Sequence, residues 1–545
     1  MYTIGYEFGD TFVQLGALEF GIRLATTKNV YAPDPTRLLI TQSTNGVKLQ
    51  ADGLIWGGGQ GRAGGTLELE ISRGADGRFV ASGNGSHLEE VTKSIVLLVR
   101  GIDVTAMSFY PGERATLEET AWGKGWIQAR RYPSNRATMP LIFVEDSGGR
   151  SWFALSKDTR LRAKYFASFF DYVSGMQNLV LSHEEDARTR GNRINMPEWH
   201  IGQVEDRAKV ALERCHDLEQ YFGLVPYPQR TDVPPWLNDI KLVAYLHGEH
   251  WTGHVFNTFD RMGDVLRWTT QRIEGKHVMA FLPAWDGRYY YNYPLYEPSE
   301  RLGGKAGLKQ LVEQAHGMGV KVVPMLGANV GNLEYVEKLG LRDAVLQNAW
   351  GQEARLHWID WDYDLAPENN LVVLNLGHPK FRNYLIERAS QLVSEFDVDG
   401  IFLDITFLWE NDSRYSPYEG TLAWAQEMRR RHPHILLFGE NSYDLLWAVF
   451  PIFHEEQGPT GHAGALHRYA RQTYYLAHPS PGSGSGGVHE GAWHYRGWKW
   501  NVPELTIPAL SVVEDSITTH ARATEAVIAR ARRWEFAPPP IASIP

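Results

Sequence analysis

Two short apolar segments in the second half of the chain each end in a carboxylate. Residues 401–403 lead into Asp404, and residues 435–439 lead into Glu440. Such runs are typical of buried parallel strands, where an acid at the strand end is unfavourable unless it is paired or used. Two carboxyl groups at the ends of successive strands are the pair that glycoside hydrolysis requires. The alternative is that each acid caps the following helix, but the repetition favours catalysis.

The elements that must position these acids alternate between strand and helix. We expect strands at 240–246, 277–282, 320–326, 401–403, 435–439, 447–453, 473–476 and 506–513, and helices at 307–318, 379–396, 421–431 and 516–533. Such alternation predicts a parallel sheet closed into a (β/α)8 TIM barrel, with its chemistry at the carboxyl ends of the strands. An open doubly wound sheet is the rival. Its Gly-rich nucleotide turn is absent after the first strand, where the chain reads His247-Gly248-Glu249-His250.

The other predicted strand ends are rich in acids, amides, histidines and aromatic residues. Together these groups suit a sugar, because flat rings bind its apolar faces and polar groups bind its hydroxyls. The predicted substrate-binding residues are His247, Glu249, His250, Trp285, Asp286, Tyr291, Asn329, Trp358, Asp360, Asp362, Trp409, Asn441, Glu455 and Glu514. The alternative for each aromatic residue is internal packing, and for each histidine a satisfied interior position. The glycine-serine run at 482–487 is predicted to be a flexible lid or loop.

The first part of the chain has a different pattern. Apolar or alternating runs such as 67–71 and 94–99 are separated by clusters of Gly, Asn, Asp and Ser, which predicts an antiparallel β-sandwich over 1–203. A helix at 206–222 and a proline-rich stretch at 225–236 predict a linker over 204–236. The catalytic barrel then covers 237–535, followed by an irregular tail at 536–545. The predicted fold class is therefore α/β, a TIM barrel preceded by a β-sandwich.

Composition narrows the function classes. The 545 residues carry 54 basic and 64 acidic side chains, and the net charge of −10 argues against nucleic acid or an anionic membrane as a partner. Cys215 is the one cysteine, no signal peptide is visible, and no apolar run approaches the ~20 residues that span a bilayer. We therefore expect a cytoplasmic protein whose partner is an oligosaccharide or glycoside substrate, and homo-oligomerisation is left open.

Several of these residues resemble motifs of retaining α-glycoside hydrolases. Arg301-Leu302-Gly303-Gly304 and residues 315–322 resemble the passage from their second helix to their third strand. Residues 399–404 resemble their fourth-strand nucleophile motif. Residues 438–440 resemble the fifth-strand acid/base motif of the α-amylase-type and endo-α-N-acetylgalactosaminidase-type enzymes.

The resemblance implies cleavage of an α-linked glycoside by double displacement, with Asp404 as nucleophile and Glu440 as general acid/base. We expect burial or the neighbouring negative charge to keep Glu440 protonated. The α-amylase type has arginine two residues before its nucleophile, where this chain has Phe402. In α-galactosidase-type relatives the acid/base is an aspartate after the sixth strand, so Glu455 and Glu456 stay alternatives. The departures indicate a separate branch.

Two other functions fit parts of the pattern. A zinc hydrolase on the same barrel would use His247, His250, His454 and Asp515 as ligands. The first two have the spacing His-Gly-Glu-His, which differs from the His-X-His of amidohydrolases, so no metal and no other cofactor is expected. A non-catalytic carbohydrate-binding protein would keep the aromatic residues without needing both acids.

Overall fold

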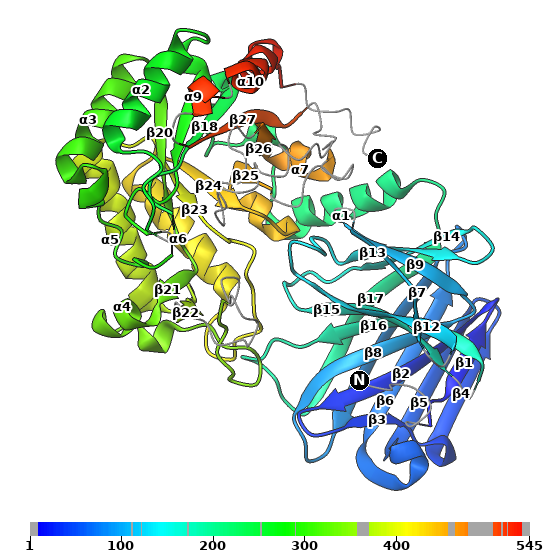
Figure 1. Cartoon of the computed structure of the whole chain (residues 1–545). Coiled ribbons are helices and arrows are strands. Elements are labelled where there is room, and N and C mark those ends of the chain that lie inside the picture. Colours follow the sequence, from blue (N-terminus) through cyan, green and yellow to red (C-terminus); the bar gives the residue numbers. More distant parts are fainter. Residues whose placement is uncertain are drawn as a thin grey trace. The chain divides into compact units, whose positions relative to one another are not determined.

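The structure is a computed structural model (Figure 1). It describes residues 9–110, 113–120, 123–171, 174–250, 253–288, 290–356, 370–455, 464–477, 505–513, 516–519 and 521–536. The chain forms two compact units that divide after Gly223. Helix α1 (Arg207–Phe222) lies in the first unit, and the proline-rich residues 224–236 lie in the second.

The first unit is an antiparallel β-sandwich, as predicted. One layer contains, in order of pairing, β1 (Phe12–Leu15), β2 (Leu18–Thr26), β8 (Thr92–Arg100), β16 (Met176–Glu184), β15 (Lys164–Asp171), β12 (Gly123–Tyr132) and β11 (Glu118–Thr120). The other contains β4 (Leu38–Ser43), β5 (Gly46–Trp56), β6 (Gly61–Arg73), β7 (Phe79–His87), β17 (Arg193–Gln203), β14 (Ser151–Ser156), β13 (Leu141–Asp146), β9 (Val104–Phe109) and β10 (Glu113–Thr116). Strand β3 (Val30–Pro33) pairs with both β2 and β5 and joins the layers. Alternating apolar residues from the two layers, such as Leu67, Leu69 and Ile71 of β6, form the core between them.

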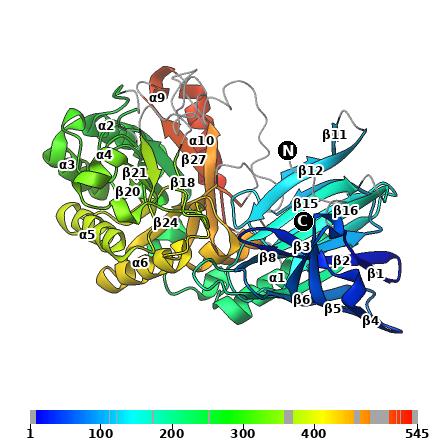
Figure 2. The ribbon, with the colours of Figure 1, turned by 90° about the horizontal axis from the view of Figure 1, so that it is seen from below.

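The second unit is a closed barrel of parallel strands with helices outside, which confirms the predicted TIM barrel (Figure 2). The barrel strands are β18 (Leu242–Leu246), β19 (Val278–Leu282), β20 (Lys321–Leu326), β23 (Gly400–Leu403), β24 (Leu436–Glu440), β25 (Ile452–His454), β26 (Arg471–Ala477) and β27 (Ile507–Val512). Strands β18, β19, β24 and β27 are buried along their whole length, as parallel strands covered on both faces must be.

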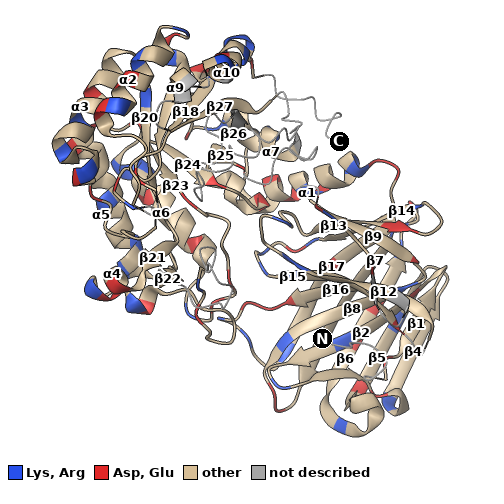
Figure 3. Cartoon of the chain, in the orientation of Figure 1, with Lys and Arg blue, Asp and Glu red and all other residues tan. Residues whose placement is uncertain are grey.

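Helices cover the outside of the barrel. They are α2 (Phe259–Thr270), α3 (Gly304–Gly317), α5 (Pro379–Phe396), α6 (Pro417–Arg431), α7 (Gly464–Tyr469), α9 (Ser516–Thr519) and α10 (Ala521–Arg533), whereas α4 (Leu333–Lys338) belongs to the insertion after β20. Their limits follow local signals: α6 starts with Pro417 after Ser416, whose side chain accepts a hydrogen bond from the Glu419 amide. The insertion after β20 also forms a two-stranded sheet of β21 (Val330–Asn332) and β22 (Leu371–Val373). Charged residues of both signs lie on these helices, whereas the barrel strands carry few charged residues (Figure 3).

The sixth barrel strand differs from the prediction over 447–453. Strand β25 starts only at Ile452, and Asp444–Ala448 forms a 3-10 helix. The apolar run is buried for another reason: the Trp447 ring stacks on Tyr469 at 5.9 Å, and its indole N–H donates to Ser442 Oγ at 3.0 Å. Periodicity cannot separate a short strand from a short buried helix.

A layer of aromatic side chains fills the barrel interior and fixes which residues face inward. The Phe402 ring lies 4.4 Å from Phe281 and 4.6 Å from Phe438. The Phe281 ring lies 4.7 Å from Tyr245, whose hydroxyl hydrogen-bonds His454 Nδ1 at 2.7 Å. Side chains two residues apart on a strand share a face, so the residues two positions after Phe402 and Phe438 also point into the barrel.

None of the helices in the described parts of the chain is long and apolar enough to cross a membrane. Cys215 is buried and carries no disulfide.

Candidate active site

The two acids singled out by the sequence lie side by side at the carboxyl end of the barrel. Strands β23 and β24 are hydrogen-bonded neighbours, and Leu403 pairs with Gly439 in their register. Asp404 directly follows β23 and Glu440 is the last residue of β24, and each comes two positions after an inward-facing phenylalanine. Their exposed fractions are 1% and 7%. Two buried carboxyl groups on adjacent strands can act on one bond.

Backbone and side-chain hydrogen bonds hold Glu440 to the residues that follow β23. The Ile405 amide donates to Glu440 Oε2 at 2.8 Å, and the Thr406 hydroxyl donates to the Glu440 carbonyl at 2.7 Å. Asn329, at the end of β20, donates from Nδ2 to the Ile405 carbonyl at 3.0 Å. The ends of β20, β23 and β24 are thereby joined, and the carboxyl of Glu440 takes its orientation from the residue that follows Asp404.

The backbone at these strand ends is strained. Ile405 has φ +43° and Asn441 has φ +49°, a left-handed conformation that non-glycine residues adopt rarely and a β-branched residue adopts least. In the loop after β19, Ala284, Tyr290 and Tyr296 also have positive φ. Such conformations concentrate at functional sites, where the surrounding structure overdetermines them. Here the conformation of Ile405 directs its N–H at Glu440.

Tyr290 contacts the predicted nucleophile directly. Its hydroxyl donates to Asp404 Oδ2 at 2.6 Å, and its side chain is buried. Burial first, and then the negative charges of Asp404 and Glu440, raise the pKa of Tyr290 well above its usual value. The phenol therefore stays protonated and acts as a hydrogen-bond donor. Both acids therefore lie close enough to influence the same phenol.

The sequence pointed to Tyr291 rather than to Tyr290. Tyr291 is half-buried, and the Arg288 guanidinium lies 3.9 Å from its ring centroid. The signal for Tyr290 was the aromatic run at 289–293, in which only the loop conformation decides which ring faces the barrel.

Asp286, in the loop after β19, is a buried carboxylic acid. It is 4% exposed, and neither carboxyl oxygen has a hydrogen-bond partner within the described protein. Burial, and to a lesser extent the charge of Glu249, raises the pKa of Asp286 to about 8. Asp286 lies in the same loop after β19 as Tyr293 and Tyr296. At neutral pH the group is a protonated acid that can donate to a ligand.

Two of the histidines at the strand ends, His250 and His454, are neutral. Burial lowers the pKa of His454 to about 3 and, with help from His254 and Arg288, that of His250 to about 4. His247 is buried, and its carbonyl accepts from Asn257 Nδ2 at 2.8 Å. Neutral imidazoles can hydrogen-bond a ligand without adding positive charge.

The residues proposed for a zinc site do not form a ligand cluster in the described part of the chain. Among those residues, no group of three or more His, Cys, Asp and Glu is arranged to hold a metal ion. His454 instead hydrogen-bonds Tyr245 inside the barrel. Asp515 lies outside the described residues.

Other predicted binding residues have internal partners. Glu249 is buried and forms an ion pair with Arg301. Trp285 is 0% exposed and donates from its indole to the Met325 carbonyl at 2.8 Å, the position of a packing residue. Glu455 is half-buried and accepts from the Ser442 hydroxyl at 2.6 Å.

Two more predicted residues, Asn441 and Trp409, are buried. The backbone N–H of Asn441 donates to the His454 carbonyl at 2.7 Å. The remaining predictions, Trp358, Asp360, Asp362, Glu514, Glu456 and the run at 482–487, lie outside the described residues. They stay predictions.

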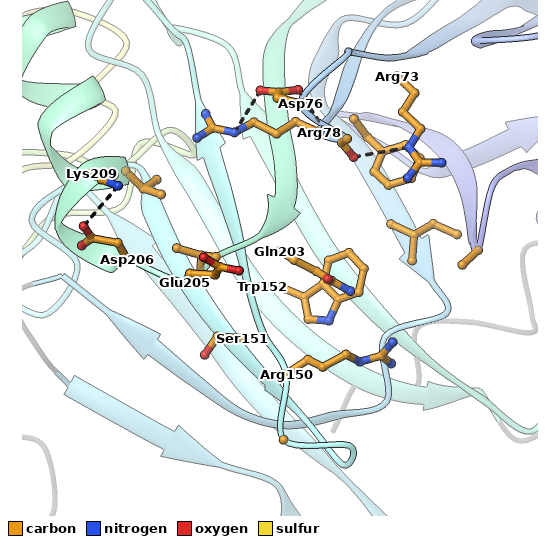
Figure 4. A pocket seen from close by; sticks show the side chains of 17 residues that line it. Arg73, Asp76, Arg78, Arg150, Ser151, Trp152, Gln203, Glu205, Asp206 and Lys209 are labelled. Atoms are coloured by element: carbon orange, nitrogen blue, oxygen red, sulfur yellow. Dashed lines mark hydrogen bonds and ion pairs between the residues drawn. The ribbon is translucent and has the colours of Figure 1, made fainter.

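A separate cavity of about 1020 Å³ lies in the β-sandwich (Figure 4). It is bounded by hairpin ends and by the start of α1. Its charged groups largely neutralise one another: Arg78 pairs with Asp76 at 3.3 Å, and Lys209 lies 3.9 Å from Asp206. Each of its two aromatic rings has an arginine nearby: the Arg150 guanidinium lies 5.8 Å from the Trp152 ring centroid, and that of Arg73 lies 5.5 Å from the Phe79 ring centroid. This lining selects no particular ligand charge.

Solved structures of α-N-acetylgalactosaminidase NagBb from Bifidobacterium bifidum resemble the chain over almost its whole length. The complex with GalNAc aligns with a TM-score of 0.65, and the complex with Gal-NHAc-DNJ with 0.64. Both are 12% identical in sequence, and both alignments cover 96% of this chain and 93% of NagBb. The chain has the fold of this TIM-barrel α-glycosidase. The resemblance predicted from the motifs is thereby confirmed at the level of the fold.

Sequence comparison gives a shorter match. No protein-family model matches the chain. The cyclomaltodextrinase of Geobacillus thermopakistaniensis (strain MAS1) is 24% identical over 185 residues, which are 32% of this chain and 30% of that protein. The match therefore spans less than a third of the relative's length.

Proposed function

We propose that this protein is a glycoside hydrolase that cleaves an α-linked glycoside with retention of configuration. The observation that carries the proposal is the pairing of Asp404 and Glu440. Their carboxyl groups leave adjacent strands at the same register, face the barrel interior and lie at its carboxyl end, where TIM-barrel enzymes perform their chemistry. The shared fold with NagBb and the sequence match to a cyclomaltodextrinase support the same class of reaction.

The proposed reaction has two displacements. In the first, a carboxylate oxygen of Asp404 bonds to the anomeric carbon while the glycosidic C–O bond breaks, and the Glu440 carboxyl gives its proton to the leaving oxygen. In the second, Glu440 takes a proton from water, whose oxygen bonds to the anomeric carbon and releases Asp404 as a carboxylate. Both acids return to their starting state, and the balance is addition of one water.

Asp286 suits the sugar-binding role predicted for it. A protonated acid can donate to a sugar hydroxyl as well as accept from one, and its two oxygens have no partner within the described protein. The neutral imidazoles of His250 and His454 offer further uncharged partners. These groups favour a neutral sugar ring, because none of them supplies a counter-ion.

The test is a panel of aryl glycosides compared across three proteins. Wild type, Asp404→Asn and Glu440→Gln are assayed on α- and β-linked N-acetylgalactosaminides, galactosides and glucosides. We expect wild type to cleave an α-linked member and to release the α-anomer first by proton NMR. Asp404→Asn should lose turnover by several orders of magnitude while keeping its fold.

The two acids are distinguished by rescue. An acid/base variant retains activity on substrates with good leaving groups, and azide accelerates it by replacing the water. Glu440→Gln should behave in this way, whereas Glu455→Gln should turn over normally. Absence of cleavage across the panel would favour a carbohydrate-binding protein, and loss of activity on metal removal would favour the zinc alternative. Near-normal turnover by Asp404→Asn would remove this residue from the nucleophile role.

A further inference from the structure

We propose that Tyr290 is a positioning residue for the nucleophile: its phenol holds one oxygen of Asp404 and thereby orients the other toward the substrate. The inference rests on the proposed function, since it assigns a role in the same reaction. It concerns a residue that the sequence did not single out. The geometry that points to it is a short, buried hydrogen bond of 2.6 Å from the Tyr290 hydroxyl to Asp404 Oδ2.

The loop around Tyr290 holds the phenol in place. The Tyr290 ring packs edge-on against Tyr293 at 5.4 Å, and Tyr293 packs against Tyr296 at 5.3 Å. The Tyr296 hydroxyl donates to the Gly327 carbonyl at 2.9 Å, which anchors this aromatic row to the end of β20. Gly327 also makes room for it, because a Cβ there would lie 2.1 Å from the Tyr293 ring.

Strain at Tyr290 shows that the surrounding structure determines its position. The residue has φ +64°, a left-handed conformation that is rare and unfavourable for an aromatic residue. The strained backbone turns the side chain inward, while the adjacent Tyr291 is half-buried beside Arg288.

The hydrogen bond has a defined effect on each displacement. It is strongest when Asp404 is a full carboxylate, because charge-assisted hydrogen bonds are about twice as strong as neutral ones. Once the anomeric carbon bonds to Oδ1, Oδ2 becomes the carbonyl oxygen of a neutral ester and the hydrogen bond weakens. In the second displacement the leaving carboxylate regains it. Tyr290 therefore favours release of the glycosyl group and fixes which oxygen attacks.

The groups around Asp404 determine how its titration responds. Glu440 on β24 is an acid, and the tyrosine row offers neutral donors whose pKa values burial raises. Removing the Tyr290 hydroxyl deletes a donor to the ionised form of Asp404. The acid limb of the pH profile, which reports ionisation of the nucleophile in the free enzyme, must then move to higher pH.

The experiment compares Tyr290→Phe with Tyr296→Phe on the aryl substrate that wild type cleaves. Each variant loses one buried phenol oxygen from the same loop and keeps its ring, but only Tyr290 contacts the nucleophile in the structure. We expect the acid limb of kcat/KM to rise by about one to two pH units in Tyr290→Phe. We also expect a roughly 10- to 100-fold fall in kcat, with KM falling in parallel because release of the glycosyl group becomes slower. Tyr296→Phe should keep the wild-type limb, and thermal unfolding of both variants checks the fold.

The outcomes separate this inference from the proposed function. An unshifted acid limb in Tyr290→Phe, or an equal shift in Tyr296→Phe, overturns the positioning role even if Asp404→Asn is inactive. Full turnover by Asp404→Asn overturns both proposals, because Tyr290 would then hold a carboxylate without a part in the reaction.

Discussion

Replacing Asp286 by asparagine should change the pH dependence of folding in a way that only a buried acid can produce. In the folded protein, burial raises the pKa of Asp286 from 3.8 to about 8. The unfolded chain loses this proton near pH 4, and the folded chain keeps it until about pH 8. The folded state therefore binds one more proton between these values, and its stability falls as pH rises through the window.

The magnitude follows from the pKa difference. Each pH unit inside the window removes about 1.4 kcal/mol of stability, so by pH 7 the ionised unfolded state has gained roughly 4 kcal/mol over the folded one. Asparagine has nearly the same shape and does not titrate. The Asp286→Asn variant should lack this fall in stability with pH and should be more stable than wild type at pH 7 by a few kcal/mol. The gain is reduced by the cost of burying an asparagine amide without a hydrogen-bond partner.

Urea denaturation at half-unit steps from pH 5 to pH 8 measures both quantities. The decisive number is the slope of the wild-type minus variant difference, because other titrating groups cancel in it. We expect about −1.4 kcal/mol per pH unit for wild type relative to the variant, flattening near pH 8. A difference that is constant from pH 5 to pH 7 would refute the reasoning, since Asp286 would then be ionised or solvated in the folded protein.

Two further substitutions test how the barrel holds the site. Hydrogen bonds from His316, Lys321 and a backbone amide hold the pKa of Asp399 below its usual value, against the effect of burial. Asp399→Asn should therefore lower the free energy of unfolding by about 1–3 kcal/mol at pH 7, and in urea denaturation this deficit should shrink as pH falls below 4. An equal deficit at pH 3 and pH 7 would contradict this. At Gly248 a Cβ would lie 2.3 Å from the Ala284 carbonyl oxygen, so Gly248→Ala should lose about 1–3 kcal/mol of stability and part of the activity. The control Gly317→Ala, whose Cβ would meet nothing within 4 Å, should be neutral or slightly stabilising in thermal unfolding. Similar behaviour of the two variants would count against a close approach of these strand ends.

The amino-acid sequence by itself was enough to predict the architecture and to identify Asp404 and Glu440 as candidate catalytic acids. Because the alternation of side chains along a strand is a local property, an apolar run that ends in a carboxylate predicted both the strand and the face of the strand from which the acid projects. Phe402 with Asp404, and Phe438 with Glu440, show this: the aromatic residue faces the barrel interior, and the acid two positions later must face the same way. Alternation of strands with helices then implied a common carboxyl end for all of them.

Only the tertiary structure decided which neighbours these acids have and in what state of protonation. The sequence could not choose between Tyr290 and Tyr291, because the choice depends on a left-handed backbone that distant packing imposes. It could not show that Trp285 is enclosed or that Asp286 is a neutral acid, because burial is produced by segments far apart along the chain. Desolvation and loop conformation are properties of the assembled barrel, whereas periodicity is a property of each strand.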